Sequence, residues 1–156
     1  MVKKALGLIR GQPAYNSRFM NHQDTAAPRE PIPKETDAVA SKVVDAAFAV
    51  HTALGPGLLE SVYEACLAHE LKKRGLKVER QVTLPVMYDN TRLDAGLRLD
   101  LVVDNRVVVE IKAVENLLPV HKAQVITYLK LTGYRLGFPV NFNTVLIKDG
   151  IQRIAL

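Results

Sequence analysis

The chain has 156 residues, of which 48% are hydrophobic and 24% are charged, a composition typical of one soluble domain with a sizeable core. Its one cysteine, Cys66, excludes an internal disulfide and a cysteine-based zinc site, and we expect a cytoplasmic protein with no membrane span. The net charge is +5, and residues 1–36 carry +3 of it through six Lys/Arg against three acids, so the charge is weak evidence for a nucleic-acid surface.

The N-terminal stretch, residues 1–36, lacks sustained hydrophobic periodicity and contains four prolines, Pro13, Pro28, Pro31 and Pro33. Too few apolar residues recur here to build a core. We therefore predict a flexible or loosely docked extension over 1–36 and a folded domain over 37–156.

Two helices are predicted next. Thr36 and Asp37 form a helix-start signal, and apolar residues then recur at helical spacing to about residue 53. After a Gly-Pro-Gly break, residues 58–75 form a second helix, which ends in a basic turn and a glycine. Its expected interior face consists of Leu59, Val62, Cys66, Leu67 and Leu71, whereas Glu60, Tyr63 and Glu64 share another face.

Residues 77–88 alternate in the manner of a strand, with Arg80 standing at one of the apolar positions. Asp89 and Asn90 predict a turn, and residues 91–95 a short return strand. The next segment, residues 97–112, reads LRLDLVVDNRVVVEIK, in which two apolar runs flank Asp104 and Asn105. This pattern predicts a β-hairpin.

The two arms of that hairpin each hold an acid inside an apolar strand, Asp100 in one and Glu110 in the other. A strict two-residue turn would place Asp100 opposite Val109 and turn it away from Glu110. A three-residue loop or one bulge would instead pair Val103 with Val107 and set Asp100 directly opposite Glu110. The sequence leaves both turns open.

If the two carboxylates converge, they repel each other unless a cation lies between them, and hard oxygen ligands favour Mg²⁺ or Mn²⁺. Lys112 shares the Glu110 face of its strand and would stand beside that cation. The alternative is a hairpin with one solvated face on which Glu and Lys alternate without a function.

A third helix is predicted from Pro119 through residue 132, where Gln124 and Tyr128 lie four residues apart on one face. His51 and His121 are expected to be ordinary structural or surface histidines. Residues 135–141 and 144–148 predict two strands, with Pro139 at an edge or a bulge, and 151–156 a final strand after a turn. The principal elements follow the order α-α-β-β-β-α-β-β, which indicates an α/β sandwich with a central mixed sheet.

Several of these motifs together resemble a known family. Asp100 followed by the Glu-x-Lys of residues 110–112 is similar to the metal site of the PD-(D/E)XK nuclease superfamily. Gly57-x-x-Glu60-x-x-Tyr63 and the ordered segments that follow resemble its GxxExxY branch, and Gln-x-x-x-Tyr at 124–128 resembles the motif of its RecB-like nucleases. The resemblance covers residues 37 to the C-terminus and implies a restriction-endonuclease-like fold, a central mixed β-sheet flanked by helices.

The resemblance also implies a function. It predicts a metal-dependent nuclease that hydrolyses phosphodiester bonds with Mg²⁺ or Mn²⁺ as cofactor. DNA is favoured over RNA as the substrate, and the sequence leaves RNA open. The implied metal ligands are Asp100, Glu110, the carbonyl of Ile111 and Glu60, and the implied catalytic residues are Lys112, Glu60, Gln124 and Tyr128. The rival prediction is a catalytically silent module of the same fold that acts in protein or nucleic-acid interaction, and a homodimer is left open in either case.

Overall fold

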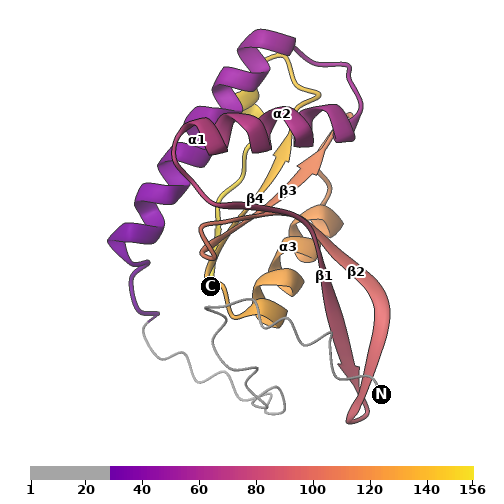
Figure 1. The fold of residues 1–156 in the computed structure, drawn as a ribbon. Helices are drawn as coiled ribbons and strands as arrows, with labels where there is room; N and C mark the ends of the chain where they lie inside the picture. The colour runs from indigo at the N-terminus through magenta and orange to yellow at the C-terminus, as the bar shows by residue number, and fades with distance from the viewer. Residues whose placement is uncertain (1–28) are drawn as a thin grey trace, which may run out of the picture.

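The computed structural model describes residues 29–156, whose principal elements follow the order α-α-β-β-β-α-β-β (Figure 1). The short strand expected at 91–95 is wrong as a separate element, because residues 91–103 form one continuous strand. The elements are α1 (Lys34–Leu54), α2 (Glu60–Lys73), β1 (Val78–Tyr88), β2 (Thr91–Val103), β3 (Val107–Lys112), α3 (Pro119–Thr132), β4 (Leu136–Asn141), the 3-10 turn η1 (Ile147–Asp149) and β5 (Ile154–Ala155).

The five strands form one mixed sheet in the order β1-β2-β3-β4-β5. All neighbouring pairs are antiparallel except β3 and β4, which are parallel and are connected by α3. Helices α1 and α2 cover one face of the sheet and α3 covers the other (Figure 1). The predicted α/β fold with a mixed sheet between helices is confirmed.

The central strand β3 is buried on both faces, which is why its sequence is apolar almost throughout. Val107, Val109 and Ile111 belong to the core beneath α1 and α2, whereas Val108 belongs to the core beneath α3. Because strand side chains alternate, Glu110 points with Val108 toward the α3 face. The chain thus carries a carboxylate into the middle of a buried strand.

The start of α1 differs from the prediction. The helix begins at Lys34 after Pro33, whose carbonyl accepts the amides of Thr36 and Asp37, and no side chain of the described residues caps it. The preceding residues dock on the body of the protein: Ile32 packs against the core, and the Arg135 side chain donates to the carbonyls of residues 30 and 31. The boundary predicted at residue 36 therefore lies inside a helix, and the rest of the extension, 1–28, lies outside the described residues.

The interior face predicted for α2 is partly wrong. Leu67 and Leu71 are buried as expected, but Leu59 is 73% exposed, whereas Tyr63 and Glu64 are buried. The reason is a tertiary contact, because the Tyr63 ring stacks on Phe142 with ring centroids 4.5 Å apart. With this stack in place, the face of α2 that carries Tyr63 and Glu64 packs against the sheet, and the neighbouring face that begins at Leu59 does not.

The segment after β4 also departs from the prediction. Residues 144–148 form no strand but a bend and the first part of η1, and β5 contains two residues. Pro139 lies in the inner strand β4, and its carbonyl accepts the amide of Gln152, so its missing N–H faces the β5 side. Pairing there is interrupted between Gly137 and Val140, which makes the proline tolerable.

Candidate active site

The turn between β2 and β3 decides where the two acids lie. Asp104 and Asn105 both have positive φ, and the Arg106 amide bonds to the Val103 carbonyl, but Val103 pairs with Val107. One extra residue therefore follows the tight turn, as in the second of the two predicted alternatives. The paired residues end at Leu101 opposite Val109, and one further step of this register sets Asp100 opposite Glu110. The two carboxylates are close, because the charge of Asp100 contributes to the raised pKa of Glu110.

Strands β2 and β3 pair over three positions and then separate, because β2 continues with β1 as a long arm beyond the body of the sheet (Figure 1). Where the strands separate, the Ile111 amide has no main-chain partner on β2, and the Asp100 carboxylate takes that place. Its Oδ2 accepts the Ile111 amide at 2.8 Å. The gap between the strands is thereby lined with oxygen atoms.

The main-chain carbonyl of Ile111 faces the same gap. Along a strand, the N–H and C=O of one residue point to the same neighbour. The Ile111 amide points to Asp100 on the β2 side, and the Lys112 carbonyl accepts the Phe142 amide on the β4 side. The Ile111 carbonyl therefore points toward β2, where the resemblance required a ligand.

Glu110 is 4% exposed, and among residues 29–156 its Oε2 has no hydrogen-bond partner. Burial, followed by the charge of Asp100, raises the pKa of Glu110 to about 8, although Lys112 acts in the opposite direction. The Lys112 Nζ lies 3.5 Å from Glu110 Oε1. Burial also raises the pKa of Asp100, opposed by the Ile111 amide. Two carboxyls and one ammonium group thus share a poorly solvated space.

Helix α2 contributes Glu60, held in place by the tyrosine of the same motif. The Tyr63 hydroxyl donates to the Gly55 carbonyl at 2.6 Å and accepts the Leu58 amide at 3.1 Å, which closes the loop before the helix. Glu60 Oε1 then accepts the Ala113 amide at 3.1 Å. The motif therefore fastens the start of α2 to the end of β3, one residue beyond Lys112.

Three further residues surround the acids and were not assigned a role from the sequence. Glu64, one turn after Glu60, accepts Arg80 Nε at 2.9 Å and Gln81 Nε2 at 2.6 Å, and Gln81 Nε2 also lies 3.5 Å from Asp100 Oδ1. One signal was available: Arg80 stood at an apolar position of an alternating strand, where a charge needs a partner.

Helix α3 brings the last two predicted residues to the site. Gln124 Nε2 donates to the Tyr128 hydroxyl at 2.9 Å. Burial and the nearby Glu110 carboxylate raise the pKa of the Tyr128 phenol. Tyr128 is 4% exposed, and it also packs in the core beneath α3. All seven residues predicted for the site therefore lie around the opening between β2 and β3.

The donor set fits a divalent cation. The Glu110 oxygen that has no partner among residues 29–156, a second carboxylate and a main-chain carbonyl are all hard oxygen donors. No three acidic, His or Cys side chains within the described part of the chain are grouped as a metal cluster. A Mg²⁺ centre here would consist of one or two carboxylates with water, which is a common arrangement for that ion.

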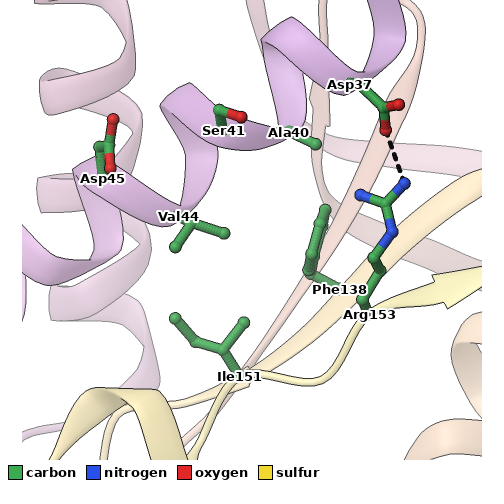
Figure 2. Close-up of a pocket in the computed structure, with 8 residues that line it drawn as sticks. All are labelled: Asp37, Ala40, Ser41, Val44, Asp45, Phe138, Ile151 and Arg153. Carbon is green, nitrogen blue, oxygen red and sulfur yellow. Dashed lines mark hydrogen bonds and ion pairs between the residues drawn. The ribbon is translucent and has the colours of Figure 1, made fainter. Parts of the chain in front are cut away.

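The protein also has a hollow of about 440 Å³ away from these acids (Figure 2). It lies between α1 and the β4–β5 region, and an ion pair of 2.6 Å between Asp37 and Arg153 borders it. Phe138, which lines it, points to the α1 face of β4, opposite to the face of Glu110. None of the predicted site residues contributes to this hollow, so it is separate from the site.

None of the helices within residues 29–156 combines the length and apolar character needed to cross a membrane. Residues 37–154 match the family model of the PD-(D/E)XK nuclease superfamily. No curated protein and no solved structure matches the chain.

Proposed function

We propose that this chain, which belongs to the PD-(D/E)XK nuclease superfamily, hydrolyses phosphodiester bonds of nucleic acid with the help of a divalent cation. The observation that carries the proposal is the convergence of Asp100 and Glu110 beside Lys112, with one buried Glu110 oxygen unpartnered among the described residues. A solvated hairpin face would leave both carboxylates in water, whereas here the Glu110 carboxylate is almost completely buried.

Asp100, Glu110 and the Ile111 carbonyl would hold Mg²⁺ or Mn²⁺. The bound cation lowers the pKa of a coordinated water and neutralises negative charge on the phosphate. The protein's own part is to hold two carboxylates together against their repulsion. The Ile111 amide does so for Asp100, and the rigidity of β3 does so for Glu110.

Lys112 is the cation of the site that the chain itself supplies. Its side chain is 15% exposed, so its ammonium group is close to the surface while it remains 3.5 Å from Glu110 Oε1. From this position it would orient the attacking water or stabilise the charge that develops on the phosphate oxygens. Replacing Lys112 by Met should therefore reduce turnover more than it reduces cation affinity.

Glu60, Gln124 and Tyr128 would support these groups from the two helices. Glu60 reaches the end of β3 through Ala113 and would complete the cation's shell directly or through water. The Gln124–Tyr128 pair would position the Glu110 side of the site or contact the nucleic-acid backbone.

A second candidate function is a catalytically silent interaction module. One observation favours it: no three metal-ligating side chains of the described residues are grouped. On this alternative the buried acid pair is a remnant of the fold, and Glu110 stays protonated at neutral pH because its pKa is raised to about 8.

A cleavage assay separates the two functions. Purified protein is incubated with single-stranded DNA, double-stranded DNA and RNA, each with Mg²⁺, Mn²⁺ or a chelator, and we expect metal-dependent cleavage with DNA as the preferred substrate. Glu110→Gln should abolish cleavage, whereas Glu115→Gln, an exposed acid just after β3, should retain it. Absence of cleavage of all three substrates with either metal would favour the interaction module.

A further inference from the structure

Gln81 has a left-handed backbone conformation, which is unusual for a residue inside a β-strand. It lies inside β1, yet its φ is +53°, in the left-handed region. The other non-glycine residues of 29–156 with positive φ are Asp89, Asn90, Asp104 and Asn105, and these form the two tight turns. Turns of that kind require positive φ, whereas a strand does not, so the conformation of Gln81 costs free energy that another interaction must offset.

The offsetting interaction is a shared carboxylate. Neighbouring side chains of a regular strand point to opposite faces. Arg80 and Gln81 are neighbours, yet both bind Glu64 of α2, Arg80 Nε at 2.9 Å and Gln81 Nε2 at 2.6 Å. The left-handed kink turns the Gln81 side chain to the carboxylate that Arg80 already holds. The positive φ of Gln81 and its hydrogen bond to Glu64 therefore depend on each other.

The same amide also reaches the proposed metal site. Gln81 Nε2 lies 3.5 Å from Asp100 Oδ1, and the register places Gln81 opposite Asp100 between two regular pairs of β1 and β2. A primary amide nitrogen carries two donors, so it can serve both carboxylates. Ionised carboxylates only accept hydrogen bonds, which requires the nitrogen rather than the oxygen of Gln81 to face them.

Both oxygens of Glu64 already accept a hydrogen bond, one from the Arg80 guanidinium and the other from the Gln81 amide. Its function in the network is to anchor Gln81. Asp100 in turn is contacted on both oxygens, by the Ile111 amide at 2.8 Å on Oδ2 and by the Gln81 amide at the longer distance of 3.5 Å on Oδ1.

We propose that Gln81 is a positioning residue, whose side-chain amide links Glu64 to Asp100 and holds the Asp100 carboxylate in the orientation that a divalent cation requires. This inference rests on the proposed metal-dependent function. It also explains why a strained conformation is kept in a strand: the strain is the consequence of turning this amide toward two acids.

The test uses Gln81→Gly in the full chain. Glycine adopts positive φ without strain, so this variant removes the amide while it relieves the backbone. Asn90→Gly is the matched control, because it relieves a positive φ at the far end of the β1–β2 arm. Two quantities are measured: the Kd for Mn²⁺ by calorimetry, and the hydrogen exchange of the Ile111 amide without metal, which reports on Asp100 through their 2.8 Å bond.

We expect both variants to melt at or above the wild-type temperature without metal. Gln81→Gly should bind Mn²⁺ about 10- to 100-fold more weakly, as is usual when a residue that orients a ligand is lost. Its Ile111 amide should exchange faster than in the wild type, and Asn90→Gly should match the wild type in both measurements.

Three outcomes would overturn the inference in different ways. If Gln81→Gly binds Mn²⁺ as the wild type does, Gln81 has no positioning role, while the metal site stands. If the variant melts far below the wild type, the side chain is structural. If the wild type itself binds no Mn²⁺ at millimolar concentration, the proposed metal function fails. If, in addition, the Ile111 amide exchanges at the same rate in Gln81→Gly as in the wild type, the link between Gln81 and Asp100 is refuted as well.

Discussion

Glu110→Gln tests the electrostatics of the site without any substrate. Burial and the Asp100 charge raise the pKa of Glu110 from 4.5 to about 8 in the folded protein. In this range the folded state binds more protons than the unfolded state, so the free energy of unfolding falls as the pH rises from about 4.5 through 8. Glutamine keeps the shape of the side chain but cannot ionise, so the part of the pH dependence that Glu110 contributes should disappear.

The magnitude follows from the two pKa values. One pKa unit corresponds to about 1.4 kcal/mol, so the rise from 4.5 to about 8 sets a ceiling of about 5 kcal/mol. The Asp100 and Glu110 carboxyls are coupled and the strands can relax, so we expect about half of this, roughly 2–3 kcal/mol. At about 3 °C for each kcal/mol, the melting temperatures of variant and wild type should differ by roughly 6–9 °C more at pH 9 than at pH 5.

The assay is a series of thermal melts from pH 5 to pH 9 in the presence of a chelator. Glu115→Gln is the control, because it removes an exposed carboxylate outside the site and should follow the wild-type curve. Adding Mn²⁺ at pH 8 should then raise the wild-type melting temperature, since a ligand of the native state stabilises it by mass action, and leave Glu110→Gln almost unchanged. Parallel pH curves for wild type and Glu110→Gln would refute the reasoning, because they would mean that Glu110 ionises as it does in water.

Three further predictions use the same kind of measurement. Without metal, Asp100→Asn should melt at or above the wild-type temperature, because it removes part of the repulsion between the two carboxylates. Mn²⁺ should raise its melting temperature only slightly, and a rise equal to that of the wild type would contradict this. Removing residues 1–28 should leave the melting temperature of the rest unchanged, whereas removing 1–35 should lower it, since the second cut also deletes Ile32 and the first two residues of α1; equal melting of both truncations would show that residues 29–35 contribute nothing. Gly150→Ala should cost about 2–3 kcal/mol in chemical unfolding, because its Cβ would lie 2.0 Å from the Asn141 carbonyl oxygen, and a loss below about 0.5 kcal/mol would mean that the chain shifts there without cost.

The sequence alone was sufficient for the order of the elements from α1 to β4, because hydrophobic periodicity and turn residues are local signals, but it wrongly predicted a strand at 144–148. It was also sufficient to single out Asp100 and Glu110, since a carboxylate among valines is unusual in any strand. Local patterns could not choose between the two turns of the β2–β3 hairpin. In the structure Arg106 is the extra residue of the loop, so Val103 pairs with Val107. As a result Asp100 lies opposite Glu110 and not opposite Val109.

Tertiary structure decided which face of α2 is inside, because the apolar stripe and the Tyr63 face are both plausible in sequence, and the stack on Phe142 is formed by residues 79 positions apart. It likewise decided the roles of Glu64, Arg80 and Gln81. Their hydrogen bonds connect α2 to β1 and β1 to β2, and the left-handed backbone of Gln81 follows from those bonds rather than from any preference of glutamine. The sequence determined which chemical groups the candidate site contains, through residue type and spacing. The packing of the helices on the sheet determined how those groups face one another.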